Sequence, residues 1–172
     1  MARSFDAAFA AEFPTLHRYL ARRVGPTAAD DLAAETFTVA YRNWAKLDPE
    51  RPVRPWLYGI AANLMRHHWR KERRMLRAYA RTGIDPVFEE DEEAVERADA
   101  NVRRRELAEM LASLSRDERE ILLLHAWAGL TDTEIAETLG VPLGTMKSRF
   151  SRTREKLRNQ LGDVGQEVVE AS

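Results

Sequence analysis

Apolar residues recur every three or four positions along most of the chain, a pattern that predicts helices with one buried face. The first such segment covers residues 5–24, and its apolar positions are Phe5, Phe9, Phe13, Leu16, Tyr19 and Leu20. We expect Pro14 to divide it into two helices, because an internal proline removes a helix hydrogen bond. Gly25 and Pro26 end the segment. No run of alternating β-branched residues predicts a strand.

A second amphipathic segment begins at Thr27, whose hydroxyl is a suitable N-cap. Asp30 and Asp31 follow near the positive end of the helix dipole. Its expected buried stripe consists of Phe37, Ala40, Tyr41 and Trp44. A loop with three prolines, KLDPERPVRP, then leads to a long helix that starts near Pro55 and ends in the basic stretch RHHWRKERR.

Residues 130–161 have the pattern of a helix-turn-helix motif. Thr131 and Glu134 have the spacing of a capping box, which predicts a helix start, and Gly140 can adopt the left-handed conformation that ends a helix. Pro142 favours the start of a second helix. We expect Met146 and Phe150, one helical turn apart, to face the core.

Charge is segregated along the chain although the formal net charge is only -1. The second helix of the motif, within residues 141–161, carries six Lys or Arg against one Glu, and residues 66–74 carry five against one. Residues 75–100 reverse this, with eight Asp or Glu against three Arg. Any attraction to nucleic acid must therefore be local.

These patterns predict an all-α protein of two small helical domains joined by a flexible acidic linker. The expected boundaries are 1–77 for the first domain, 78–95 for the linker, 96–161 for the second domain and 162–172 for a loose tail. At 172 residues and 44% hydrophobic content the chain can form two such cores.

A basic helix is often only a solvated face. Here the capped first helix, the glycine turn and the basic second helix together favour DNA binding. Recognition helices present their early turns to the bases. The candidates for contact with DNA are Thr145, Lys147, Ser148, Arg149, Arg152 and Arg154.

The chain resembles the extracytoplasmic-function (ECF) group of bacterial sigma factors, the small promoter-specificity subunits of RNA polymerase. DDLAAETFTVAYRNW is similar to the polymerase-binding segment of that family, and PVRPWLYGIAANLMRHHWRKERR to its helix for opening and reading the promoter -10 element. LTDTEIAETLGVPLGTMKSR is similar to its -35 reader. The resemblance covers about 150 of the 172 residues, in the family's order.

The resemblance implies that the acidic helix docks on the clamp of the largest subunit of core RNA polymerase and that the second domain meets the flap of the second-largest subunit. The implied contacts with core polymerase are Asp31, Leu32, Glu35, Thr36 and Arg42. The alternative is that Asp30 and Asp31 only complement the helix dipole.

It also implies that the helix from Pro55 and the preceding loop hold a single DNA strand, which requires cationic groups for the backbone and a pocket or aromatic faces for an unstacked base. The implied -10 contacts are Lys46, Arg54, Tyr58, Asn63, Arg66, His67 and Arg70. The amide of Asn63 can both donate to and accept from a base edge. We interpret Trp56 as a core residue.

By the same resemblance the acidic linker threads the basic RNA path of the polymerase, although a merely solvated spacer has the same composition. The expected partners are core RNA polymerase, promoter DNA and an anti-sigma factor. Selective promoter binding is expected only together with core polymerase.

No cofactor, metal site or enzymatic activity is expected. The chain has no cysteine, its glycines are scattered, and the adjacent His67 and His68 point about 100° apart on a helix. No apolar run approaches the roughly 20 residues that span a bilayer, so we expect a cytoplasmic protein. Two alternatives stay open: a stand-alone helix-turn-helix regulator with an N-terminal sensing or dimerisation domain, and an interaction protein such as a sigma-sequestering decoy.

Overall fold

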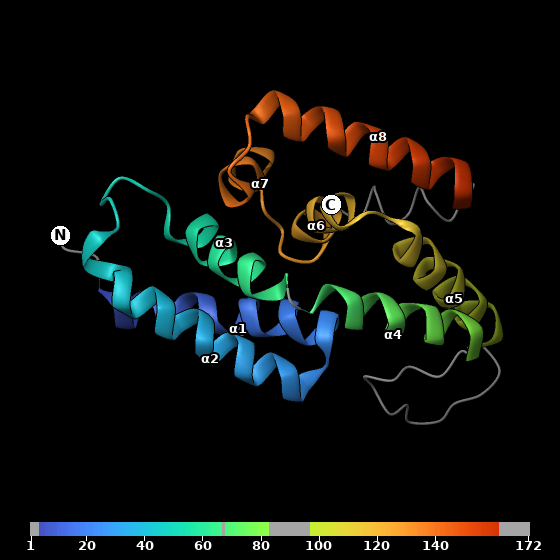
Figure 1. Cartoon of the computed structure of the whole chain (residues 1–172), viewed down its shortest axis with the longest axis horizontal. Helices are drawn as coiled ribbons and strands as arrows, with labels where there is room; N and C mark the ends of the chain where they lie inside the picture. The colour runs from blue at the N-terminus through green and yellow to red at the C-terminus, as the bar shows by residue number, and fades with distance from the viewer. Residues whose placement is uncertain (1–3, 67, 83–96, 162–172) are drawn as a thin grey trace.

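The computed structural model describes residues 4–66, 68–82 and 97–161, which form an N-terminal and a C-terminal block of helices (Figure 1). The N-terminal block contains α1 (Phe5–Val24), α2 (Pro26–Asn43), the short 3-10 helix η1 (Trp44–Lys46), α3 (Val53–Met65) and α4 (Trp69–Thr82). The C-terminal block contains α5 (Arg97–Ser113), α6 (Arg116–Ala126), α7 (Asp132–Leu139) and α8 (Leu143–Leu161). Over these residues the all-α prediction is confirmed.

Helix α1 runs through Pro14 without a break, so the predicted division into two helices is wrong. Pro14 itself is exposed, while Phe9 and Phe13 before it and His17 after it contact side chains of α2. The ring centroids of Phe9 and Phe13 lie 4.8 and 5.7 Å from that of Phe37. Contacts on both sides of Pro14 therefore keep α1 a single continuous helix. The backbone hydrogen bond that the proline cannot make lies at the surface.

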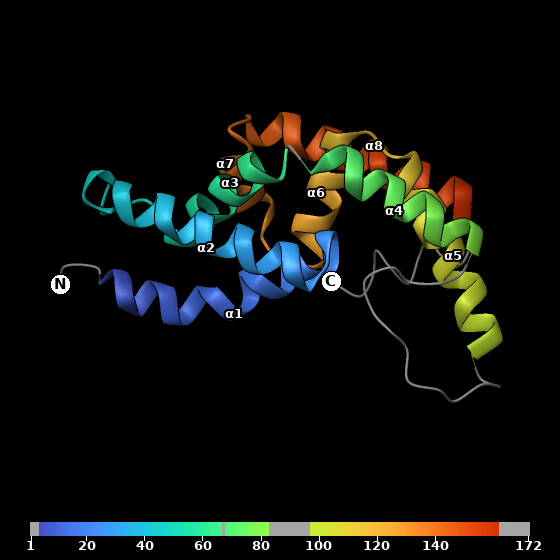
Figure 2. The ribbon, with the colours of Figure 1, turned by 60° about the horizontal axis from the view of Figure 1, so that its bottom comes forward.

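Helix α2 begins at Pro26 and not at the predicted cap Thr27. Gly25 precedes it with φ of 90°, a conformation that side-chain-bearing residues rarely adopt. Proline suits the first helical position because its φ is already fixed near the helical value. This glycine-proline pair allows α1 and α2 to lie side by side after a very short connection (Figure 2).

The single long helix expected after Pro55 is two helices, α3 and α4, which separate near Arg66. Helix α4 continues to Thr82, so the first residues of the predicted linker, 78–82, are helical. Its partly buried Leu76 packs against the core, which explains why the helix extends past the basic stretch. The rest of the predicted linker and the tail 162–172 lie outside the described residues.

The helix-turn-helix prediction is confirmed in detail. Thr131 and Glu134 form a complete capping box, and Gly140 ends α7 in the left-handed conformation with φ of 64°. Met146 and Phe150 are buried, as expected. A second capping box, of Ser115 and Glu118, starts α6.

The two blocks pack against each other and their buried side chains form one continuous cluster. Helix α7 lies against α3, and α5 lies against α4, in both views (Figures 1 and 2). The N-terminal part of this cluster includes Leu16, Leu20, Leu57 and Met65, and the C-terminal part includes Leu114, Ile121, Leu124 and Ile135. The arrangement is therefore closed, and the surfaces between the blocks are covered.

The capping box of α7 gives a test of the C-terminal block. We expect Thr131→Ala to lower the free energy of unfolding by about 1 kcal/mol, because it removes the oxygen that accepts from the amide of Glu134. Thr133→Ala, at an exposed position of the same helix, is the matched control and should change the stability by less than about 0.5 kcal/mol. Urea unfolding followed by circular dichroism measures both, and equal effects would contradict the capping role.

Candidate nucleic-acid interface

Helix α8 is amphipathic, with a narrow buried face and a broad polar face. Met146, Phe150, Thr153 and Leu157 are buried, at the spacing of one helical stripe. The hydroxyl of Thr153 donates to the carbonyl of Arg149 at 2.9 Å, so this polar group is satisfied. The opposite side of the helix is therefore free for another molecule.

The six predicted -35 residues divide into two groups. Lys147, Ser148 and Arg152 are exposed on the polar side of α8. Thr145, Arg149 and Arg154 are half-buried. The guanidinium of Arg149 lies 3.6 Å from the carboxylate of Asp117, and that of Arg154 lies over the ring of Phe150 at 5.7 Å.

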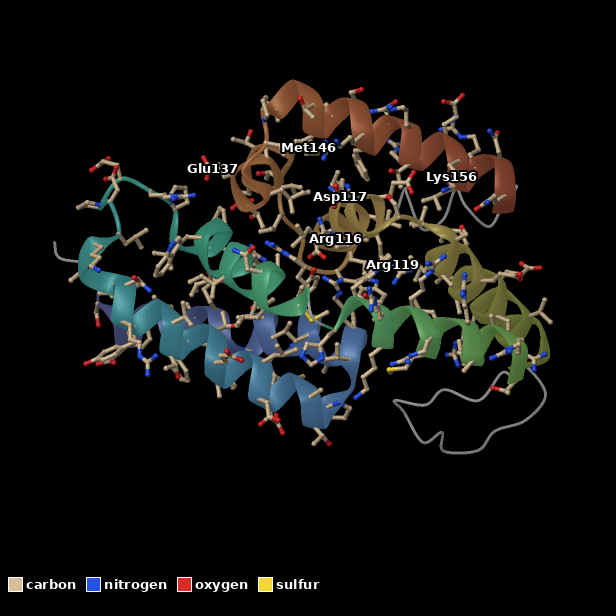
Figure 3. The ribbon with its side chains drawn as sticks, in the orientation of Figure 1. Arg116, Asp117, Arg119, Glu137, Met146 and Lys156 are labelled. Atoms are coloured by element: carbon tan, nitrogen blue, oxygen red, sulfur yellow. The ribbon has the colours of Figure 1, made fainter. Side chains whose placement is uncertain are left out.

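Helix α8 is also tied to α6 near its far end. The ammonium of Lys156 lies 3.4 Å from a carboxylate oxygen of Glu118 (Lys156 and Asp117 are labelled in Figure 3). Burial acts to raise the pKa of Glu118, but hydrogen bonds from Ser115 and the charge of Lys156 outweigh it and lower that pKa. Two ion pairs about two turns apart thus hold the basic helix on α6.

The predicted -10 residues lie on α3, η1 and the start of α4. Lys46, Asn63, Arg66 and Arg70 are exposed. Arg66 donates a hydrogen bond to the carbonyl oxygen of the Asn63 amide. Because arginine can only donate, this contact leaves the NH₂ group of Asn63 available as a donor. His67 lies outside the described residues.

Two of the predicted -10 residues are engaged inside the molecule. Tyr58 is fully buried, so it cannot contact DNA in this conformation. Arg54 lies over the Tyr58 ring, with its guanidinium 3.6 Å from Glu12, and donates to the carbonyl of Ala128 in the C-terminal block at 2.5 Å. Burial raises the pKa of Tyr58, against the influence of Arg54.

The predicted polymerase-binding residues on α2 divide in the same way. Asp31, Glu35 and Arg42 are exposed. Leu32 and Thr36 are buried, and the Thr36 hydroxyl donates to the carbonyl of Leu32 at 2.7 Å. These two side chains support the helix from beneath, so in this conformation they are not accessible to a partner.

The exposed side of α2 carries an aromatic side chain as well as the expected acidic ones. Neither Asp30 nor Asp31 lies in the first turn of α2, where the helix dipole acts most strongly. Their position therefore does not favour a role limited to complementing the dipole. Asp30 instead lies 2.7 Å from the imidazole of His17. Tyr41, predicted to be buried, is 68% exposed and meets Phe5 edge-on at 5.1 Å. Acidic and aromatic groups thus share this surface.

A buried ionic network between the blocks was not predicted from the sequence. Arg23 donates to Glu72 at 2.9 Å and to Glu120 at 2.7 Å, and Tyr19 donates to Glu120 at 2.9 Å. Arg119 lies 3.4 Å from Glu72. Burial alone would lower the pKa of Arg23, but Glu120, Tyr19 and Glu72 outweigh it and raise that pKa.

Arg119 has further partners that explain its complete burial. It donates to the carbonyl of Leu111 at 2.8 Å, and its guanidinium lies over the ring of Trp69 at 4.3 Å. A sequence signal did exist. Arg119 and Glu120 stand directly before the apolar run ILLL inside a helix, where charged residues are buried only if they are paired.

A cavity of about 190 Å³ lies between two of the predicted -10 residues and Arg149, one of the predicted -35 residues. Its wall includes Asn63 and Arg66 from the N-terminal block and Asp117 and Arg149 from the C-terminal block. Figure 3 shows Arg116 and Asp117 on α6 beside this region, and Arg119 farther along the same helix. Within the described residues, no group of three His, Cys, Asp or Glu could hold a metal ion.

Comparison with known proteins identifies both blocks. Residues 8–75 match the family described as Sigma-70 region 2, and residues 104–157 match Sigma-70, region 4. RNA polymerase sigma factor CarQ of Myxococcus xanthus is 33% identical over 167 residues, which cover 96% of this chain and 94% of CarQ. The ECF RNA polymerase sigma factor SigW of Bacillus subtilis is 32% identical over 79% of this chain and 76% of SigW.

The chain is an RNA polymerase sigma factor of the ECF group of the sigma-70 family. Among solved structures, CnrH in complex with the cytosolic domain of CnrY matches with a TM-score of 0.66 and 25% identity, over 92% of this chain and 88% of CnrH. RpoE of Bartonella quintana, solved with the anti-sigma factor NepR, shares the fold with a TM-score of 0.63. No helix within the described parts of this sigma factor is long and apolar enough to cross a membrane.

Two tyrosines of the interface give a matched test of the buried network. Their rings lie 5.4 Å apart, but the Tyr19 hydroxyl bonds to Glu120 and Arg23, whereas that of Tyr58 has no hydrogen-bond partner among the described residues. We expect Tyr19→Phe to lower the free energy of unfolding by about 1–3 kcal/mol, because it leaves buried charges less well satisfied. Tyr58→Phe should be neutral or slightly stabilising. Urea denaturation distinguishes the two, and equal losses would contradict this view of the network.

Proposed function

We propose that this sigma factor binds core RNA polymerase, reads the -35 and -10 elements of its promoters with separate blocks, and promotes strand opening at the -10 element. The observation that carries the proposal is that regions 2 and 4 both match, in the family's order, and that each block has an exposed basic surface. Such a factor contributes recognition and leaves catalysis to the polymerase, so its action belongs to the cytoplasm, where bacterial transcription occurs.

For the -35 element, α8 is proposed to enter the major groove with its early turns. Lys147, Ser148 and Arg152 are the first contacts, because they are exposed on its polar side. Arg149 can join them by exchanging its ion pair with Asp117 for a phosphate or a guanine edge. Thr145 and Arg154 then complete the surface at its borders.

For the -10 element, Asn63 is proposed to read an unstacked base of the non-template strand. Since its carbonyl oxygen accepts from Arg66, the amide offers a donor, and the preferred base is one with an acceptor on the contacted edge. Lys46, Arg66 and Arg70 supply charge for the strand, together with His67. Arg54 and Tyr58 can take part only after the blocks separate.

For core polymerase, the exposed acidic and aromatic side of α2 is proposed to dock on the clamp of the largest subunit. Asp31, Glu35 and Arg42 are its charged members, and Leu32 and Thr36 support them from within. The C-terminal block is proposed to meet the flap of the second-largest subunit. The CnrH and RpoE structures contain CnrY and NepR, and we propose that an anti-sigma factor likewise controls this protein.

A reconstituted transcription assay tests this function. Core polymerase freed of its own sigma factor is supplied with the protein and with a library of genomic fragments, and opened promoters are detected by permanganate reactivity of unpaired thymines. We expect a small set of fragments to open only when both components are present. Sequence-specific binding by the protein alone, without opening when core is added, would instead support a stand-alone regulator.

The -35 assignment predicts an effect that depends on position along α8. Lys147→Ala should weaken promoter binding by the holoenzyme about tenfold and reduce the dependence of log K on log salt by about one, because one phosphate contact is lost. Arg158→Ala removes the same charge at the far end of the helix and serves as the control. Filter binding across a salt series measures both, and equal losses would mean that only net charge matters. Assembly with core polymerase should be unchanged in each.

The -10 assignment predicts a defect in opening without a defect in assembly. Asn63→Ala should slow formation of the open complex by about tenfold, since it removes a donor to the unstacked base. Asn159→Ala, an exposed asparagine on α8, is the matched control. Permanganate reactivity over time follows opening. If Asn63→Ala opened promoters at the wild-type rate, Asn63 would not contribute to reading the -10 element.

A further inference from the structure

The cavity between the blocks has an excess of positive charge on its wall. The wall carries two carboxylates, those of Asp117 and Glu120. It also carries four arginines, each from a different helix or helix end: Arg23, Arg66, Arg116 and Arg149. Like charges that are gathered on one wall repel one another and attract an anion.

Internal ion pairs compensate only the most buried of these arginines. Arg23 lies 2.9 and 2.7 Å from two carboxylates, one in each block. Arg116 and Arg149 share the carboxylate of Asp117, at 3.0 and 3.6 Å. Arg66 donates to a neutral amide. Among the described residues, Asp117 is therefore the sole carboxylate paired with three guanidinium groups.

These three guanidinium groups are accessible and reach the cavity from different elements. Arg66 is the exposed C-cap residue of α3, Arg116 begins α6, and Arg149 lies on α8. The side chains of Arg116 and Arg149 are 49% and 39% exposed. Asn63 adds a neutral donor, since Arg66 occupies its carbonyl oxygen and leaves its NH₂ group available. Figure 3 shows Arg116 at the start of α6, beside the cavity.

The floor of the cavity is small and apolar, so it does not compete for these donors. Gly59 belongs to it, and a Cβ atom placed there would lie only 3.2 Å from the backbone carbonyl of Thr138. The volume of about 190 Å³ is several times the roughly 30 Å³ that one water occupies in the liquid. It is smaller than the roughly 300 Å³ at which pockets for drug-sized ligands begin. The cavity therefore suits a small polyatomic ion.

We propose that this cavity binds a phosphate dianion, either inorganic phosphate or the terminal group of a phosphate monoester. A tetrahedral dianion presents oxygens in several directions, so it can accept hydrogen bonds from all three arginines at once. A planar carboxylate is already satisfied by one bidentate arginine. The two negative charges of the dianion match the excess of four arginines over two carboxylates on the wall. The site does not depend on the proposed function, because polymerase and DNA contribute nothing to it.

A bound phosphate joins the two blocks. Arg66 belongs to the N-terminal block, whereas Arg116 and Arg149 belong to the C-terminal block. The ion therefore binds the packed arrangement more tightly than separated blocks and stabilises it in proportion to its occupancy. Asp117 opposes binding, because its carboxylate must release or share two arginines when the ion enters.

Isothermal titration calorimetry of the full chain with inorganic phosphate tests the site, at an ionic strength held constant with chloride. We expect saturable binding of one ion per chain. Arg116→Gln should weaken this binding about tenfold, because one charge-assisted hydrogen bond is lost. Arg158→Gln removes the same charge from an exposed position near the end of α8 and should change the affinity by less than about twofold.

Removal of the competing carboxylate should have the opposite effect, which a loss of folding cannot imitate. Asp117→Asn should strengthen phosphate binding about fivefold, because the ion no longer competes with a surface ion pair. Glu155→Gln removes an exposed carboxylate from α8 and controls for net charge. Binding that does not saturate would overturn the proposal, and so would equal effects within either matched pair.

A second titration distinguishes the two sources of phosphate. Adenosine monophosphate carries the same terminal group on a larger body. Tighter binding than that of inorganic phosphate identifies a monoester as the ligand, and equal or weaker binding identifies the free ion. Both titrations omit polymerase and promoter. A failure to bind phosphate therefore contradicts this site alone, whereas a failure to bind core polymerase contradicts only the proposed function.

Discussion

The buried guanidinium of Arg23 sets the constraint on which the closed structure depends. A buried cation requires carboxylate partners, and Arg23 finds Glu72 in its own block and Glu120 in the other. Arg119 repeats the arrangement in the opposite direction, reaching from α6 to Glu72. Each block therefore completes the electrostatics of its neighbour, and the position of α7 over α3 follows from this pairing.

In this arrangement, ion pairs compensate part of the charge that is segregated along the chain. Basic side chains are gathered on α8 and around the end of α3, and the acidic groups that meet those of α8 in the free protein are Asp117 and Glu118 on α6. Contacts with DNA and polymerase can replace these internal pairs one for one. Ion pairs with α6 thus compensate part of the basic charge of α8 in the free protein, while Lys147 and Arg152 stay exposed.

The sequence predicts local structure well and contacts between the blocks poorly, for physical reasons. The capping box of Thr131, the turn at Gly140 and the buried Met146 and Phe150 depend on neighbours in the chain, and all were predicted. The burial of Leu32, Thr36 and Tyr58 depends on how helices face one another, which periodicity leaves open when aromatic or small residues lie at the border of a stripe. The unbroken α1 and the network around Arg23 depend on packing with segments far along the chain.

Binding to core RNA polymerase tests the central claim most directly. Labelled protein is titrated with sigma-free bacterial core at physiological salt and followed by fluorescence anisotropy, with a known sigma factor as competitor. The account predicts saturable binding that the competitor displaces, because both must occupy the same clamp and flap. Absence of binding by a chain shown to be folded and free of inhibitor would contradict it, as would binding that a known sigma factor does not displace.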